Sequence, residues 1–181
     1  MNIEEARDLV WSRVKNKNLR KHILAVAAVM KHLARRLSED EDRWELCGML
    51  HDLDYEETKD DPERHTLVAE AVLRELGVDE DIIEAVKAHA EKAPLDKTMN
   101  IAAYCADPVT GLIVACALIH PEKKLAPIDA AFAMKRFKEK RFAAGADRDR
   151  IRACEKLGID LEEFLDLSIR AMKGISRELG L

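Results

Sequence analysis

The stretch GMLHDLDYEET, residues 48–58, decides how the chain folds, because a run of apolar side chains there meets a histidine, an aspartate and further acids. The apolar residues that lead into it, such as Trp44 and Cys47, have the spacing of a helix that packs into a protein core. His51 and Asp52 continue that helix, and a buried polar group without a partner costs about 1–3 kcal/mol. The sequence therefore predicts a helix whose end brings His51 and Asp52 next to a partner.

The composition predicts a single all-α domain over residues 1–181. Apolar residues make up 48% of the chain and charged residues 36%, which is typical of a folded protein and argues against disorder. The hydrophobic period is that of a helix nearly everywhere, and no alternating strand pattern is present. No apolar run approaches the roughly 20 residues that cross a bilayer, and the acidic N-terminus does not resemble a signal peptide. We therefore expect a cytoplasmic protein without a membrane partner.

Periodic segments and their start and stop signals predict a series of amphipathic helices. Asp61 and Pro62 are expected to open a helix that closes at Gly77, after an acidic loop over 54–62. Pro108 disfavours helical geometry at the residue before it and is expected to interrupt the most apolar helix. The expected helices cover residues 3–16, 18–37, 42–53, 62–77, 79–90, 98–119, 127–140, 147–157 and 161–179.

Four of the six histidines share an apolar stripe with core residues, each on a different helix. A single inward histidine is more often a core residue bonded to a backbone carbonyl, and Asp107 could simply cap the segment begun by Pro108. One cation would satisfy all of these inward polar groups together, because imidazole and carboxylate bind first-row divalent metals well. We therefore predict a metal site, and leave out His32 near a polar face and His120 at a helix end. The candidate ligands are His22, His51, Asp52, His65, His89 and Asp107.

The order of these residues resembles the HD-domain superfamily of metal-dependent phosphohydrolases, an all-helical fold. Its motif is an isolated histidine, an adjacent His-Asp pair and a distant aspartate. His65 and His89 lie between the pair and the last aspartate, as in the subset that binds two metals. The stretches ADPVTGLIVACALIHPEKK (106–124) and FKEKRFAAGADRD (137–149) are similar to a narrower group of small bacterial and archaeal HD proteins, described only as predicted hydrolases. The resemblance implies an HD-type helical bundle.

The chain departs from the common HDIGK form of this motif. Asp54 stands in place of the glycine and Tyr55 in place of the lysine, so no role of that lysine is carried over. No glutamate lies three residues after Asp52, so the acid used by some single-metal nucleotidases of the superfamily has no counterpart. The resemblance places the metal-binding core at about residues 18–120 and the C-terminal helices at 127–179.

The resemblance also implies a cofactor and a reaction. We expect one or two divalent transition metal ions, drawn from Mn, Fe, Ni, Co and Zn. The expected reaction is hydrolysis of a phosphoester bond in a small nucleotide or a related phosphorylated molecule. Asp52 is the expected catalytic residue, since it would bridge the two ions. The first ion is expected on His22, His51, Asp52 and Asp107, and the second on His65 and His89.

The residues that would meet the substrate are less clearly indicated. The basic segment 134–152 offers Lys135 and Lys138, together with Arg136 and Lys140, to offset the charge of a phosphorylated substrate. In the acidic stretch, Asp54 or Glu56 could shuttle a proton, but a solvated loop is the preferred interpretation. Nucleic acid is not an expected partner, because the basic segment is short and the net charge of the chain is −5.

Two alternatives share the same ligands. Some HD proteins with this set, such as the myo-inositol oxygenases, hold two irons and activate oxygen, although the sugar-binding lysines of those enzymes have no counterpart here. The other alternative is a non-catalytic module that is stabilised by metal and senses a ligand. The oligomeric state is left open.

Overall fold

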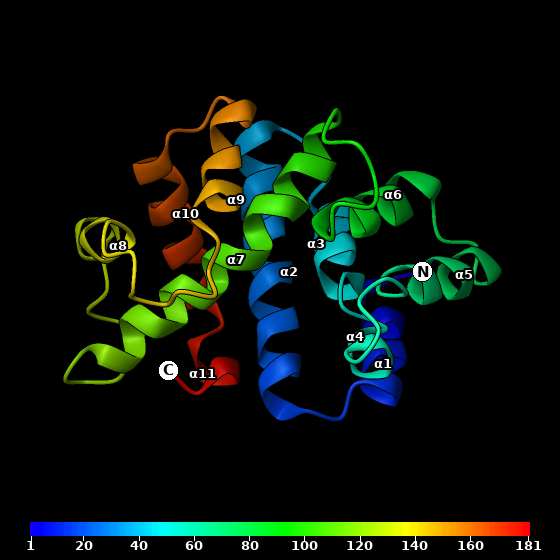
Figure 1. Ribbon diagram of the computed structural model, residues 1–181, viewed down its shortest axis with the longest axis horizontal. Coiled ribbons are helices and arrows are strands. Elements are labelled where there is room, and N and C mark those ends of the chain that lie inside the picture. The colour runs from blue at the N-terminus through cyan, green and yellow to red at the C-terminus, as the bar shows by residue number, and fades with distance from the viewer.

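The chain folds into helices joined by turns, and no strand is present in the computed structural model, which describes residues 1–181 (Figure 1). This confirms the prediction of an all-α fold. The elements are α1 (Ile3–Arg13), α2 (Lys17–Leu37), α3 (Glu41–Leu50), α4 (Tyr55–Thr58), α5 (Leu67–Glu75), α6 (Glu80–His89), α7 (Thr98–Ile119), α8 (Ala130–Phe137), α9 (Arg148–Arg152), a 3-10 helix (Ala153–Leu157), α10 (Leu161–Gly174) and α11 (Ser176–Leu179).

Helix α2 runs through the middle of the molecule and organises the other elements (Figure 1). In this view α1 and α3 to α6 lie on one side of it and α8, α10 and α11 on the other, while α7 crosses it. Helix α2 packs on α3 and α7, and α6 packs on both of these in turn. One hydrophobic core of 51 buried residues extends from Ala6 to Leu179. This arrangement brings the end of α3, the end of α6 and the middle of α7 together beside α2.

Gly48 allows α2 and α3 to approach each other closely. A Cβ atom at this position would lie 2.6 Å from the Cα of Ala27 and 2.9 Å from its backbone nitrogen, distances that real Cβ atoms do not show. Glycine is therefore required where the two backbones meet. The close approach sets the end of α3, and with it His51 and Asp52, against α2.

Helix α7 continues through Pro108, so the predicted interruption was wrong. Proline removes the hydrogen bond that the carbonyl of Tyr104 would otherwise accept. The guanidinium of Arg150, on α9, donates to that carbonyl oxygen at 3.5 Å and so replaces part of what is lost. The expectation that no apolar run approaches membrane-spanning length was also wrong, since α7 is long and apolar enough by composition. Its most apolar window is 61% buried inside the protein, as in the central helix of a core.

Helix α5 begins later than predicted, at Leu67 instead of Pro62. The residues between them form turns, and Thr66 has a left-handed backbone conformation, φ 69°, just before the helix. The cause is Asp54, whose carboxylate accepts hydrogen bonds from the backbone N–H groups of Thr66 at 3.1 Å and Ala69 at 2.8 Å. The carboxylate of Asp54 satisfies free amides of the first turn. Asp54 therefore caps the helix in place of Asp61, the predicted N-cap.

The C-terminal helices are shorter than predicted. Helix α8 replaces the helix expected over 127–140, and the next predicted helix divides into α9 and the 3-10 helix. Asp129 caps α8 by accepting a hydrogen bond from its first turn at 2.7 Å. Arg148 donates to the carbonyl oxygens of Ala143 at 2.8 Å and Ala146 at 2.6 Å, which fixes the turn before α9. The fixed turn sets the position of α9 against α7.

Candidate metal centre

Six polar side chains converge where α2, α3, α6, α7 and the turn before α5 meet. His51, Asp52 and His89 are buried, and the other three are half-buried. The ring centres of His65 and His89 lie 5.1 Å apart and those of His51 and His89 4.9 Å apart, so the expected convergence is found. We call these residues the six-residue cluster; it comprises His22, His51, Asp52, His65, His89 and Asp107, the candidate ligands named from the sequence.

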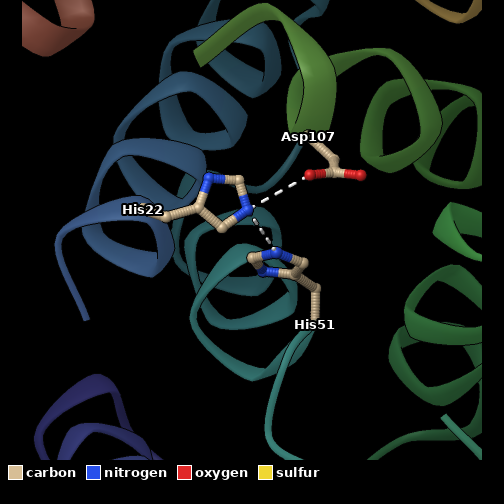
Figure 2. A group of neighbouring side chains, drawn as sticks. All are labelled: His22, His51 and Asp107. Carbon is tan, nitrogen blue, oxygen red and sulfur yellow. Dashed lines mark hydrogen bonds and ion pairs between the residues drawn. The ribbon is translucent and has the colours of Figure 1, made fainter. Parts of the chain in front are cut away.

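The first half of the cluster surrounds His22 (Figure 2). The Nε2 atom of His22 lies 3.2 Å from the Nε2 of His51 and 3.1 Å from the Oδ1 of Asp107. The Oδ2 of Asp52 lies 3.3 Å from the Nε2 of His51 and 3.7 Å from that of His22. We call these four atoms the first donor group, and imidazole nitrogens and carboxylate oxygens have the chemistry of a divalent metal site.

The second half of the cluster faces the other oxygen of Asp52. The Nε2 atoms of His65 and His89 are 3.2 Å apart. The Oδ1 of Asp52 lies 3.5 Å from the Nε2 of His65 and 3.6 Å from the Nε2 of His89. We call these three atoms the second donor group. Because the two oxygens of Asp52 face different groups of imidazoles, its carboxylate stands between them in the position of a bridging ligand.

Backbone carbonyl groups orient two of the four imidazoles. The Nδ1–H of His51 donates to the carbonyl oxygen of Gly48 at 2.8 Å. The Nδ1–H of His89 donates to that of Val86 at 2.5 Å. In a neutral ring with its proton on Nδ1, the Nε2 atom carries a free lone pair. Both rings therefore present a lone pair to the cluster, with the outer hydrogen bond that histidine ligands of metals usually make.

Side chains orient the other two imidazoles. The Nδ1–H of His65 donates to the Oδ1 of Asp54 at 2.8 Å. His22 contacts the hydroxyl oxygen of Thr110 through Nδ1 at 3.1 Å, and this hydroxyl donates to the backbone carbonyl of Asp107 at 2.9 Å. Since the hydroxyl proton is committed to the carbonyl, the hydroxyl oxygen accepts from the Nδ1–H of His22. These rings too present an Nε2 lone pair to the cluster.

The donor atoms therefore fit a bound cation. Four lone pairs and two carboxylates face one another, and the nitrogen pairs are only 3.2 Å apart. Lone pairs at that separation repel each other unless a proton or a metal ion lies between them. Neutral imidazole nitrogens and carboxylate oxygens are suitable ligands for Mn, Fe, Co, Ni and Zn.

The charges of the cluster also favour a cation. Burial opposes ionisation of Asp52 and Asp107, but the facing imidazoles outweigh it and hold the pKa of both carboxyl groups below the ordinary value. Burial likewise opposes protonation of His51, but its attraction to Asp52 raises the pKa of this imidazole to about 9. Burial lowers the pKa of His89. A metal ion that binds to the imidazole lone pairs competes with protons for them, so we expect metal affinity to fall at low pH.

Asp54 is part of the centre, in a role that the sequence pattern did not indicate. The acidic stretch was interpreted as a solvated loop, but Asp54 is 1% exposed and the stretch contains helix α4. Burial opposes its ionisation, but hydrogen bonds from His65, Ala69 and Thr66 lower its pKa below the ordinary value. One carboxylate thus starts helix α5 and sets the tautomer of His65. Glu56 is half-buried and accepts hydrogen bonds from the backbone N–H groups of Lys15 and Asn16, just before α2.

Asp54→Asn is expected to weaken manganese binding at the second donor group by about 10- to 100-fold. The amide that replaces one carboxylate oxygen donates instead of accepting. If the NH2 group faces His65, the Nδ1–H of His65 loses its acceptor, or its proton moves to Nε2 and removes the lone pair that faces the cluster. If the NH2 group faces Ala69, the backbone N–H of Ala69 loses its acceptor instead. Calorimetric titration of manganese into the chelator-treated protein measures the change.

Glu57→Gln is the matched control for that variant. It removes the same charge from a nearby exposed side chain, which pairs only with Arg13 and Arg64. We expect its manganese affinity to equal that of the wild type. If Asp54→Asn also left the affinity unchanged, Asp54 would not be controlling His65.

The cluster lines a cleft of about 390 Å³. All of its members except His51 contribute to the wall, together with Leu19, Tyr55, Ala90 and Arg150. The ring of Tyr55 is 45% exposed and packs edge-to-face on that of His65, with ring centres 5.5 Å apart. The cleft therefore gives solutes access to the donor atoms.

Arg150 is the second residue of the centre that the sequence pattern did not indicate. It lies beyond the predicted core of residues 18–120, and its only signal was its place in the basic segment 134–152. Lys135 and Lys138, which were selected from that segment, do not line the cleft. The cationic group that the fold brings to the cleft is the guanidinium of Arg150.

Comparison with known proteins gives one family match and several distant relatives. A family model described as HD domain matches residues 19–148, a span that contains the whole six-residue cluster. Ribonuclease Y of Oleidesulfovibrio alaskensis is 28% identical over 96 residues, which are 53% of this chain and 18% of the relative. Ribonuclease Y of Salinispora arenicola is 27% identical over 94 residues, 52% of this chain and 16% of the relative. The chain thus matches less than a fifth of the length of these relatives, and no solved structure matches it significantly.

Proposed function

Because the chain belongs to the HD domain family, whose members are in general metal-dependent phosphohydrolases, we propose that it hydrolyses a phosphoester bond with the help of divalent metal ions. The substrate we propose is a small nucleotide or a related phosphorylated molecule. One observation supports the proposal above all others. The two oxygens of Asp52 face two separate groups of imidazole lone pairs, as a carboxylate that serves two ions would.

The residues that would hold the ions follow from the two donor groups. His22, His51 and Asp107 would hold one ion and His65 and His89 the other, with Asp52 contributing to both. When bound, such ions supply Lewis acidity, which polarises a phosphoester and makes water more acidic.

The side chains of the cleft have their own tasks in this proposal. Asp52 is the proposed catalytic residue, since its pKa lies well below the ordinary value and its ionised carboxylate only accepts hydrogen bonds. It would therefore orient the attacking water. The guanidinium of Arg150, at the wall of the cleft, would face the negative charge of the phosphate, for which its planar donor set is suited.

RNA is the competing substrate, because the relatives are named as ribonucleases. We favour a small molecule for two reasons. The cleft measures only about 390 Å³, and a net charge of −5 opposes binding of a long polyanion. The matched segment is also less than a fifth of each relative, so their activity as whole proteins does not transfer to this chain directly.

A panel of phosphoesters tests this function. Protein loaded with manganese, cobalt or nickel is incubated with p-nitrophenyl phosphate, bis(p-nitrophenyl) phosphate, nucleoside monophosphates, cyclic dinucleotides and a short RNA. We expect hydrolysis of at least one small phosphoester that stops on addition of EDTA and resumes when metal is restored. No hydrolysis of any compound by metal-loaded protein would contradict the proposal, and a clear preference for the RNA would replace the small substrate with a nucleic acid.

A further inference from the structure

Arg150 joins parts of the metal centre that lie on different helices. From α9, its Nη2 atom donates to the Oδ2 of Asp107 on α7 at 2.8 Å. The same atom donates to the backbone carbonyl oxygen of His89, the last residue of α6, at 2.7 Å. The guanidinium lies over the ring of Tyr104, 4.8 Å from its centre, which holds the guanidinium in place.

These contacts reach both donor groups. The Oδ1 of Asp107 lies 3.1 Å from the Nε2 of His22 in the first donor group, while Arg150 holds the other oxygen of the same carboxylate. His89 provides an imidazole of the second donor group, and Arg150 holds the end of the helix that carries it. One guanidinium therefore fixes the carboxylate of the first group and the backbone of the second.

A purely structural role explains only part of this arrangement. The third contact of Nη2 is with the carbonyl of Tyr104, at 3.5 Å, and this contact serves the continuity of α7 at Pro108. The two shorter contacts are with a carboxylate that faces the cluster and with the residue that carries an imidazole of the cluster. The contact with Asp107 also joins α9 to α7, but the contact with His89 reaches a different helix, α6.

We propose that Arg150 is a positioning residue that raises the affinity of the centre for divalent ions by fixing Asp107 and His89. It lies beyond the segment 19–148 that the family model matches, so the match itself does not imply this role. Outer partners of metal ligands typically contribute about 10- to 100-fold to metal affinity. The positive charge of Arg150 acts in the opposite direction, because it repels cations. If positioning dominates, removal of Arg150 lowers the metal affinity, and if charge repulsion dominates, its removal raises the metal affinity.

Manganese titrated by calorimetry into the chelator-treated, full-length protein provides the test. Arg150→Met is expected to bind manganese about 10- to 100-fold more weakly than the wild type. Arg150→Lys is expected to restore little of this loss, because one ammonium group cannot reproduce the planar fork or the stacking of a guanidinium. Arg152→Gln is the matched control, since Arg152 is a half-exposed neighbour that pairs with Glu155, and its manganese affinity should equal that of the wild type.

The thermal midpoint in EDTA separates positioning from packing. If Arg150 only packs α9 on α7, its replacement should lower this midpoint and leave the manganese affinity unchanged. Unchanged or tighter manganese binding by Arg150→Met would therefore overturn the proposal. If the methionine variant does not fold, the same titration of Arg150→Lys decides between the two outcomes. The titration contains no substrate, so its result is independent of whether the chain hydrolyses phosphoesters.

Discussion

Asp52→Ala is expected to reduce metal-dependent phosphoester hydrolysis to the level of the metal-free protein. The two oxygens of Asp52 face His51 at 3.3 Å and His65 at 3.5 Å, so its removal takes one donor from each half of the cluster. It also leaves imidazole lone pairs facing one another without the negative charge that attracts a cation between them. Initial rates on the best compound of the phosphoester panel, at saturating manganese, measure the effect.

His32→Ala and His120→Ala are the controls, and both are expected to retain activity within a few-fold of the wild type. His32 bonds to the carbonyl of Ala28 on its own helix, and His120 follows the end of α7. Circular dichroism and the thermal midpoint in EDTA establish that each variant is folded. Comparable losses of activity in all three folded variants would mean that the histidines were assigned wrongly.

Removal of metal is expected to lower the thermal midpoint of the protein by about 5–10 °C. A ligand at 100 times its Kd stabilises the folded state by about 2.7 kcal/mol, and a domain of this size gains about 2–4 °C for each kcal/mol. The physical origin is the cluster itself, whose carboxylates and lone pairs repel one another when no cation is bound. Thermal unfolding followed with EDTA, and again after addition of excess manganese, measures the shift.

The same scans contain their own control. The folded Asp52→Ala variant, which lacks the residue shared by the two donor groups, should show little difference between EDTA and manganese. A wild-type midpoint that responds to neither chelator nor manganese would remove the thermodynamic basis of the metal centre.

Much of the cluster could be predicted from the sequence because His22, His89 and Asp107 belong to helices with apolar faces. Periodicity places His22 and His89 on inward faces, and inward polar groups need a common partner. His65 was assigned to a helix by the same periodicity, but it lies in the turn before α5. The adjacent pair His51-Asp52 at the end of a helix was equally visible. These inferences use only local spacing, which a single sequence records well.

Asp54 and Arg150 could not be predicted because their roles depend on contacts between distant segments. Asp54 lies in an acidic run that has the composition of a solvated loop, yet it caps a helix that begins at Leu67. Arg150 meets Asp107 only because α9 packs on α7. Local composition in the basic segment gave no reason to prefer it over Lys135.

Two errors in the predicted helices have the same origin. Pro108 should interrupt a helix by local rules, but Arg150 donates to the carbonyl that the proline leaves free, and α7 continues. Pro62 should begin a helix by local rules, but capping by Asp54 moves the start to Leu67. In both cases the departure from the local rule coincides with a contact from a distant residue, and both residues lie at the metal centre.

The most direct test of the metal centre is the number and identity of the metal ions bound per chain. Elemental analysis is made of the wild-type protein twice, first as purified and then after dialysis against manganese. The double variant His65→Ala/His89→Ala is analysed in the same two states. We expect two divalent ions per chain in the wild type and one in the double variant, because the first donor group remains complete. Two irons would shift the function toward the oxygenase alternative while keeping the centre. A purified wild type that contains no metal and takes up no manganese on dialysis would contradict the metal centre.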